Sequence, residues 1–190
     1  MRGLLIIFSS PSGGGKTSVI RAILQQYPND FVYSVSATTR PPRPGEIHGT
    51  DYLFLSPEEF EQFIRDDRLL EWEHVHDYYY GTPRQFIDEA INQGKMVLLD
   101  IDVNGALRIA ERYPQICLTI FLAPPSIDKL VERLRARKTD SAEAINRRLE
   151  RIPLEMKKAS QFDYIIINDD LQRTIDEVVQ VIFEFRKKHN

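Results

Sequence analysis

The residues best suited to chemistry lie near the start of the 190-residue chain. An apolar run at residues 4–8 leads into a small-residue loop that ends in Gly15, Lys16 and Thr17, at the head of an amphipathic helix. Glycines let successive backbone N–H groups point inward, and a helix N-terminus adds partial positive charge, so such a loop binds phosphate oxygens. Lys16 would reach the β- and γ-phosphates of a nucleotide, and the Thr17 hydroxyl would bind Mg²⁺.

The loop departs at one position from the P-loop pattern G-x-x-x-x-G-K-[ST], because Ser10 stands where the first glycine belongs. Serine is also small, and the strand and helix that a P-loop requires flank the loop. The sequence therefore predicts a site for a nucleoside triphosphate. The residues predicted to bind it are Ser10, Pro11, Ser12, Gly13, Gly14, Gly15, Lys16, Thr17 and Ser18.

Three further apolar runs, at residues 96–99, 116–122 and 164–167, lie between helical patterns. Continuous hydrophobicity is typical of strands covered on both faces, so we predict an α/β fold with a parallel sheet between two layers of helices. Capping signals mark several helix ends. Thr82 and Pro83 would begin one helix and Gly94 would end it, and Ser126 and Asp170 would begin two others.

The hydrophobic pattern of the sequence changes between the helix that follows the loop and Thr82. Short runs at residues 33–37, 52–55 and 69–72 look like half-buried strands, which are usually antiparallel, and Ser56 opens a short helix with a capping box. We therefore predict a small α+β insertion that binds a phosphorylated ligand. Groups suited to such a ligand are Ser36, Arg40, Arg43, Tyr52, Glu71, Tyr78, Tyr79, Tyr80 and Thr82.

Composition limits the other functions that the chain could have. A net charge of −3 argues against a general nucleic-acid-binding or polybasic membrane-surface protein. The lone Cys117 lies in an apolar run and is interpreted as a small buried hydrophobe. With no signal peptide, no long apolar stretch and no cysteine pair, we expect a cytoplasmic protein without a membrane or nucleic-acid partner. The sequence leaves the oligomeric state open.

An ordered set of short motifs resembles the guanylate kinase family, whose members pass a phosphoryl group from ATP to GMP. The motifs lie at residues 34–46, 49–54, 70–72, 80–82, 99–102, 147–149 and 168–170, so the resemblance covers nearly the whole chain. It implies a P-loop core at residues 1–32, 83–125 and 158–190, a GMP-binding insertion at 33–82, and a lid at 126–157. ATP and GMP would be the substrates, and Mg²⁺ the cofactor.

The resemblance also implies roles for residues of the insertion. Arg40, Arg43, Tyr52 and Tyr80 would hold the GMP phosphate, since arginine forms charge-assisted and bidentate bonds with it. Glu71, held by packing of its neighbours Leu70 and Trp72, would accept hydrogen bonds from guanine N1–H and the exocyclic amine. Ser36 and Thr82 would donate to guanine O6. The remaining residues assigned to GMP are Gly81, Asp100 and Asp102, whereas Tyr78 and Tyr79 are interpreted as packing residues beside Tyr80.

Other implied roles fall on the core and the lid. Asp100 ends an apolar strand and would order Mg²⁺ through water, while Asp102 would either share that duty or contact GMP. Arg137 and Arg148 would cover the transferring phosphoryl group, and Asn168 would lie by the adenine ring. The predicted catalytic residues are Lys16, Arg40, Arg43, Asp100, Arg137 and Arg148.

Two positions depart from the family pattern and affect the lid. Lys138 stands where glycine is common, and Pro153 interrupts a helical pattern that it should kink or end. His74 and His76 are interpreted as ordinary polar residues rather than a metal pair.

Two alternatives to an ATP:GMP phosphotransferase remain. One is a guanylate-kinase-like module that binds partner proteins without catalysis, and the intact Gly-Lys-Thr, both lid arginines and the lack of appended domains favour the enzyme instead. The other is a P-loop kinase for a different small phosphorylated acceptor. Ser36, Glu71 and Thr82 together argue against it.

Overall fold

The computed structural model describes residues 3–75, 77–136 and 142–189, and for residues 136 and 142–148 the backbone alone. The elements in chain order are β1 (Leu4–Ser9), α1 (Lys16–Gln26), β2 (Phe31–Tyr33), β3 (Ala37–Thr38), β4 (Leu53–Phe54), α2 (Pro57–Arg65), β5 (Leu69–Val75), β6 (Tyr78–Pro83), α3 (Arg84–Asn92), β7 (Met96–Asp100), α4 (Val103–Arg112), β8 (Cys117–Ala123), α5 (Ile127–Ala136), α6 (Ala142–Lys158), a short 3₁₀ helix (Ala159–Gln161), β9 (Tyr164–Ile167) and α7 (Leu171–His189).

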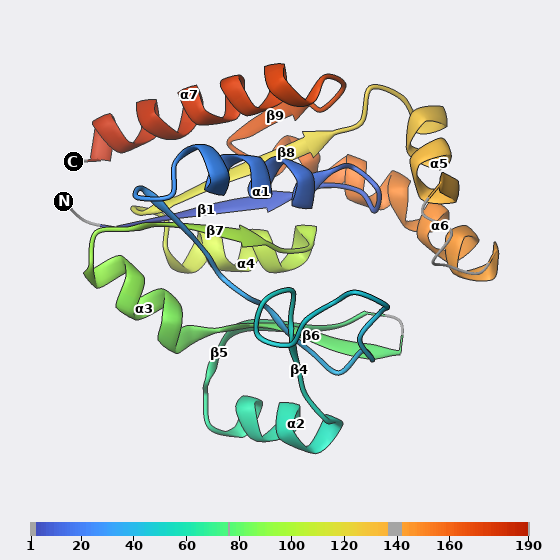
Figure 1. Ribbon diagram of the computed structural model, residues 1–190, viewed down its shortest axis with the longest axis horizontal. Coiled ribbons are helices and arrows are strands. Elements are labelled where there is room, and N and C mark those ends of the chain that lie inside the picture. The colour runs from blue at the N-terminus through green and yellow to red at the C-terminus, as the bar shows by residue number, and fades with distance from the viewer. Residues whose placement is uncertain (1–2, 76, 137–141, 190) are drawn as a thin grey trace.

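Five strands form the central parallel sheet, in the order β2-β7-β1-β8-β9. Every residue of β1 is buried, because the strand lies in the middle of the sheet and is covered on both faces. Figure 1 shows α1 and α7 on one side of this sheet and α3 and α4 on the other. The prediction of an α/β fold around a parallel sheet is confirmed, and the four apolar runs are β1, β7, β8 and β9.

A second, smaller sheet has the strand order β4-β3-β6-β5 and lies below the central sheet in Figure 1. It carries a core of its own, in which Phe60 of α2 is buried with Ala37 and Leu69. The predicted capping box is present, since Ser56 Oγ accepts from Glu59 N at 3.2 Å and Ser56 N donates to Glu59 Oε2 at 2.7 Å.

Two strand predictions are wrong in this region. Tyr33 belongs to β2, which pairs in parallel with β7 of the central sheet, because Phe31 packs into the main core rather than into the insertion. The strands are also not all antiparallel: β3 pairs with β6 in antiparallel fashion but with β4 in parallel.

The helix ends follow the sequence signals at three of four positions. Ser126 Oγ accepts from Lys129 N at 3.1 Å, Asp170 Oδ1 accepts from Arg173 N at 2.8 Å, and Gly94 follows α3 with a φ of +74°. The prediction for Thr82 is wrong. Strand β6 continues through Pro83, which is the N-cap of α3, and the Thr82 hydroxyl is used by another group.

Helix α6 continues through Pro153 to Lys158, so of the two predicted outcomes, a kink or an end, the structure excludes the end. A proline removes one backbone hydrogen bond, and the neighbouring Ile152 is buried, so packing holds the helix across that gap. A kink at Pro153 stays a prediction. Lys138 lies outside the described residues.

Cys117 is buried at the start of β8, as predicted, and burial raises the pKa of its thiol to about 12. Within the described ranges, none of the helices combines the length and apolar character needed to cross a membrane.

Candidate active site

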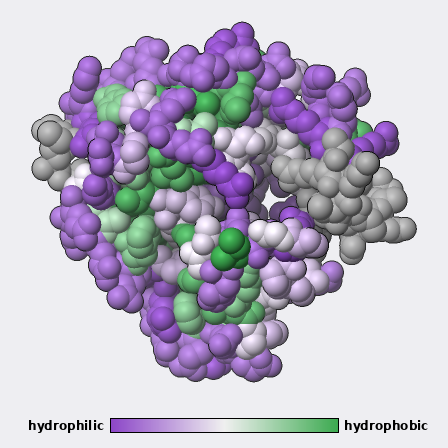
Figure 2. Space-filling model, in the orientation of Figure 1, coloured by the Kyte–Doolittle hydropathy of each residue, from purple (hydrophilic) through white to green (hydrophobic). Residues whose placement is uncertain are grey.

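A cleft of about 290 Å³ separates the P-loop from the smaller sheet. Figure 2 shows the surface hollowed near its centre, in the region that lies between the two sheets in Figure 1. The lining residues come from segments far apart in the sequence: Ser10, Ser12, Gly13, Gly14, Gly15, Lys16, Thr17, Ser36, Arg40, Arg43, Tyr52, Glu71, Val75, Tyr80, Gly81, Asp100, Ile101, Asp102, Arg151 and Glu155.

The P-loop connects β1 to α1 and ends in Gly15, whose φ is +90°. An L side chain rarely adopts this conformation, and a Cβ there would also collide with the Asn168 amide. No side chain caps α1, and its first turn carries no acidic residue. The backbone N–H groups at this helix N-terminus therefore suit an anion such as a phosphate.

Ser10 fits the first position of the loop because Gly14 lies opposite. A Cβ on Gly14 would be 2.5 Å from Ser10 Oγ, so the two positions have room for one small side chain. Ser10 Oγ donates to the Pro11 carbonyl at 2.9 Å, and the Gly14 N–H donates to the same carbonyl at 2.9 Å. The serine thus adds one hydrogen bond within the loop.

Asn168 lies behind the loop instead of lining the cleft. It is only 4% exposed, and its Nδ2 donates to the Gly14 carbonyl at 2.7 Å. The backbone carbonyl of Asn168 accepts hydrogen bonds from the Arg133 guanidinium at 3.2 Å. The side chain of Asn168 therefore contacts the backbone of the P-loop.

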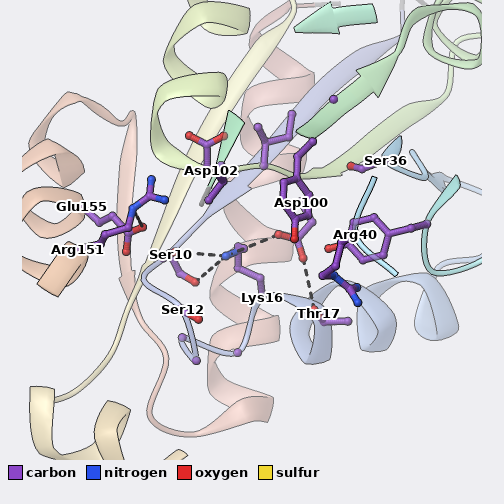
Figure 3. Close-up of a pocket in the computed structure, with 18 of the residues that line it drawn as sticks. Ser10, Ser12, Lys16, Thr17, Ser36, Arg40, Asp100, Asp102, Arg151 and Glu155 are labelled. Atoms are coloured by element: carbon purple, nitrogen blue, oxygen red, sulfur yellow. Dashed lines mark hydrogen bonds and ion pairs between the residues drawn. The ribbon is translucent and has the colours of Figure 1, made fainter. Parts of the chain in front are cut away.

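Lys16, Thr17 and Asp100 meet at the centre of the site (Figure 3). Lys16 Nζ donates to Ser10 Oγ at 3.1 Å and lies 3.6 Å from Asp100 Oδ1, and the Thr17 hydroxyl donates to Asp100 Oδ2 at 3.4 Å. One hydroxyl and one carboxylate suit Mg²⁺, which usually keeps several waters and takes the rest of its ligands from phosphates. The described residues contain no cluster of three or more His, Cys, Asp or Glu that would hold a metal without a substrate.

Asp102 differs from Asp100 in its partners, although both line the cleft. Its Oδ1 caps α4 by accepting from Asn104 N at 2.8 Å and Gly105 N at 3.3 Å. Burial and the charge of Glu73 raise the pKa of Asp102. In the structure Asp100 contacts the P-loop, whereas Asp102 contacts α4.

The smaller sheet supplies a cation on the opposite wall. Figure 3 shows Arg40 and Ser36 on the side of Lys16 away from Arg151 and Glu155. Arg40 is buried, and its Nη2 donates to both carboxylate oxygens of Glu46 at 2.9 Å. The guanidinium also lies 5.4 Å from the centre of the Tyr52 ring. Arg40 is therefore fixed before any ligand arrives.

The aromatic residues of this wall divide into two groups, one that lines the cleft and one that packs in the core of the smaller sheet. The Tyr52 and Tyr80 rings are 6.2 Å apart and both line the cleft, and burial raises the pKa of Tyr52. Tyr79 stacks on Phe60 at 5.3 Å in the core of the smaller sheet, which confirms its interpretation as a packing residue.

Glu71 is the most unusual group in the cleft, because it is a carboxylate only 8% exposed. A register shift between Leu69 and Glu71 lets Leu70 enter the main core while Glu71 faces the cleft. Burial raises the pKa of Glu71 to about 7, although hydrogen bonds from Thr82 and Arg108 oppose this effect.

Hydrogen bonds, rather than packing by both neighbours, hold this carboxylate. Trp72 is 43% exposed, so the expectation that it packs around Glu71 is wrong. The Thr82 hydroxyl donates to Glu71 Oε1 at 2.7 Å, and Arg108 Nη2 donates to Oε2 at 3.3 Å. Thr82 is buried behind Glu71 and does not line the cleft.

Sequence reasoning missed Arg108, Arg151 and Glu155. Arg151 and Glu155 reach the cleft from α6, with Arg151 Nε and Glu155 Oε1 3.9 Å apart. Burial raises the pKa of Glu155, while Lys16, Arg151 and the Ser12 N–H lower it. Their only sequence signal is the i,i+4 spacing, which usually marks a surface ion pair.

Besides Asn168 and Thr82, four predicted residues lie apart from the cleft lining or outside the described residues. Pro11 and Ser18 contribute to the P-loop backbone, where Pro11 O accepts from Gly14 N and Ser18 N donates to Gly15 O. Arg137 and the side chain of Arg148 lie outside the described residues. His74 contacts the Tyr79 ring, and His76 is not described.

A P-loop on a parallel sheet, facing a second sheet that carries a buried arginine and a buried carboxylate, defines a P-loop kinase with a separate acceptor site. The family model described as guanylate kinase matches residues 2–185. A guanylate kinase of Synechocystis sp. is 45% identical over 97% of this chain and 95% of its own length. One from Gloeobacter violaceus is 47% identical over 95% of this chain and 87% of its own length.

A solved structure agrees with this assignment. The crystal structure of guanylate kinase from Anaplasma phagocytophilum is similar with a TM-score of 0.81 and 30% identity, over 99% of this chain and 87% of that one. The chain belongs to the guanylate kinase family and is a nucleoside monophosphate kinase.

Proposed function

We propose that this chain transfers the γ-phosphoryl group of ATP to GMP, and to dGMP as well, with Mg²⁺, as a step of purine nucleotide metabolism in the cytoplasm. The observation that carries the proposal is that the P-loop and the buried Glu71 line one cleft. A P-loop binds the donor triphosphate, and a buried carboxylate on the facing sheet suits the N–H groups of a guanine edge.

The donor half of the site would work through Lys16, Thr17 and Asp100. Lys16 is held 3.6 Å from Asp100 and would follow the γ-phosphate during transfer. Thr17 and Asp100 would hold Mg²⁺, Asp100 through water. When bound, Mg²⁺ supplies positive charge to the phosphate oxygens. Asn168 would keep the loop in shape through Gly14.

The acceptor half would bind GMP by its phosphate and by its base. Arg40, Arg43, Tyr52 and Tyr80 would hold the phosphate, and Glu71 would accept from guanine N1–H and the amine. Ser36 would donate to O6. The Thr82 hydroxyl donates to Glu71 Oε1 from behind the cleft and would hold that carboxylate rather than bind O6. No general base is needed, because the attacking phosphate is already anionic and catalysis rests on positioning and charge. Arg137 and Arg148 would add charge from the lid.

A coupled ADP-release assay with GMP, dGMP, AMP, CMP and UMP tests the proposal. We expect kcat/KM to be highest for GMP, with dGMP next and the other three far lower. A higher value for a non-guanine acceptor would favour a related kinase. No ADP release with any nucleotide, from protein that binds GMP, would favour a protein-binding module.

A further inference from the structure

Arg108 extends from α4 toward the smaller sheet. Helix α4 lies between the two sheets (Figure 1), and Arg108 Nη2 donates to Glu71 Oε2 at 3.3 Å, to the Trp72 carbonyl at 3.2 Å and to Glu73 Oε2 at 3.2 Å. The guanidinium thus bridges two carboxylates and one backbone carbonyl of β5. The side chain is 47% exposed, so it reaches this place from the surface.

The Glu71 carboxylate is held from two sides. Thr82 donates to Oε1 and Arg108 donates to Oε2. A carboxylate oxygen can accept two hydrogen bonds, so both oxygens keep an acceptor position for a ligand. Glu71 lines the cleft whereas Thr82 and Arg108 do not, and its two partners therefore lie behind it as seen from the ligand.

The backbone of α4 is adapted to this contact. A Cβ on Gly105 would lie 2.6 Å from Glu71 Oε2, so only glycine lets the helix come this close. Residues three apart lie on one face of a helix, and Arg108 follows Gly105 by three residues. The position without a side chain and the arginine therefore serve the same carboxylate oxygen.

Arg108 is itself held in place. Glu73 Oε1 accepts from Asn104 Nδ2 at 2.9 Å, and Asn104 Oδ1 accepts from Lys158 Nζ. Glu73 is thus fixed on one oxygen by Asn104 and offers the other to Arg108. A long, half-exposed side chain gains a defined position from this arrangement.

We propose that Arg108 is a positioning residue for guanine selection, which fixes the orientation of Glu71 and favours its ionised form. This inference rests on the proposed function of Glu71 as the reader of the guanine edge. An ionised carboxylate accepts from both guanine donors, whereas a protonated one carries a hydrogen that opposes one of them.

The charges around Glu71 give this role a measurable consequence. Burial and the charge of Asp102 raise the pKa of Glu71, Thr82 and Arg108 lower it, and the balance of these effects is a pKa of about 7. Glu73 is the other acid beside Arg108. Without Arg108, none of these groups carries a positive charge that offsets the effect of burial. The pKa of Glu71 would then rise, and the carboxyl would stay protonated to higher pH.

The first test measures the Glu71 carboxyl directly, in the free protein. A carbon-13 NMR titration, with the resonance assigned by Glu71→Gln, is run on wild type, Arg108→Gln, Arg108→Lys and the control Arg112→Gln. Arg112 is an exposed arginine on the same helix. We expect Arg108→Gln to raise the pKa of Glu71 by about one unit, Arg108→Lys to raise it less, and Arg112→Gln to leave it unchanged.

The second test measures GMP and AMP dissociation constants for the same variants at pH 6 and pH 8.5. A one-unit shift predicts that Arg108→Gln weakens GMP binding about tenfold at pH 6 but less than about twofold at pH 8.5, with AMP unaffected. A loss of packing alone would be the same at both pH values.

The outcomes separate the two proposals. An unchanged Glu71 titration in Arg108→Gln overturns the role of Arg108, however tightly GMP binds. A shifted titration with an unchanged GMP/AMP ratio overturns guanine selection by Arg108. If wild type binds GMP no better than AMP, the proposed function of Glu71 fails, while the titration still reports whether Arg108 controls its charge.

Discussion

Replacing Glu71 by Gln should change how the stability of the protein depends on pH. Gln has the shape of a protonated Glu but does not titrate. In the folded protein burial raises the pKa of Glu71 to about 7, whereas the ordinary value is 4.5. The folded state therefore binds one proton more than the unfolded chain between these two pH values.

The sign and size follow from this difference. The stabilisation by the Glu71 proton is fully present below pH 4.5 and is lost as the pH rises through about 7. At 1.36 kcal/mol per pKa unit, the free energy of unfolding of wild type should fall by up to about 3 kcal/mol relative to Glu71→Gln. The nearby Asp102 and Arg108 are present in both proteins, so their own contributions largely cancel in the comparison.

Urea unfolding of both proteins at half-unit steps from pH 4.5 to pH 8.5 measures this difference. We expect the free energy of unfolding of Glu71→Gln, measured relative to that of wild type, to increase as the pH rises. Parallel curves, with a constant difference at every pH, would refute the assignment of a raised pKa to Glu71.

The same variant tests guanine selection. Gln sets an amide N–H₂ against one guanine donor, and unpaired buried groups cost about 1–3 kcal/mol, or roughly 10- to 100-fold in kcat/KM for GMP. Activity with AMP should stay low, so the GMP/AMP ratio should narrow. A ratio equal to that of wild type would mean that another group reads the base.

Five further variants test other parts of the protein. Lys16→Ala should stay folded but lose about 10²–10³ in rate, and more than half of wild-type kcat would contradict the P-loop assignment. Arg137→Ala and Arg148→Ala should lower kcat more than they raise KM in steady-state assays, because the lid would contact the phosphoryl group chiefly when closed. An increase in KM with unchanged kcat would contradict this role of the two arginines. A kink at Pro153 would act as a hinge between the lid and the core, so Pro153→Ala should raise the melting temperature slightly and change kcat at a constant GMP/AMP ratio, and an unchanged kcat would refute the hinge. Asn168→Ala removes the bond to the buried Gly14 carbonyl and should cost about 1–3 kcal/mol in urea unfolding and weaken ATP binding, and normal ATP affinity would count against its role in the loop.

The central sheet was predictable because its main strands leave a local signal. Four runs of continuous apolar residues became four parallel strands, and β1, β7 and β8 are covered on both faces as such runs require. The expectation of cover on both faces is wrong for β9, which lies at the edge of the sheet and leaves Ile165 and Ile167 exposed. Strand β2 was misassigned because it is three residues long, and its alternating pattern runs on toward β3. The chain passes there from the central sheet to the smaller sheet while the alternating pattern continues, so periodicity alone does not show to which sheet each residue belongs.

The P-loop was predictable because its residues are contiguous, and the second wall was inferred from motifs on neighbouring strands. Arg108 was missed because its place depends on how α4 packs against β5, which no local pattern sets. Gly105 offered a signal, since glycine inside a helix costs about 1 kcal/mol relative to alanine and often marks a close approach. Here the group approached is Glu71.

Two cations of the cleft, Lys16 and Arg40, are held in place by the protein before a ligand binds. Lys16 is held by Ser10 and Asp100, and Arg40 is held bidentately by Glu46. A cation already fixed by the protein need not lose side-chain freedom when phosphate arrives, and its charge acts without reorganisation. The two cations lie on opposite walls, because Lys16 begins α1 beside the central sheet whereas Arg40 follows β3 of the smaller sheet. Under the proposed function each wall would therefore bind its phosphate alone, and transfer would require both walls to hold their phosphates at once.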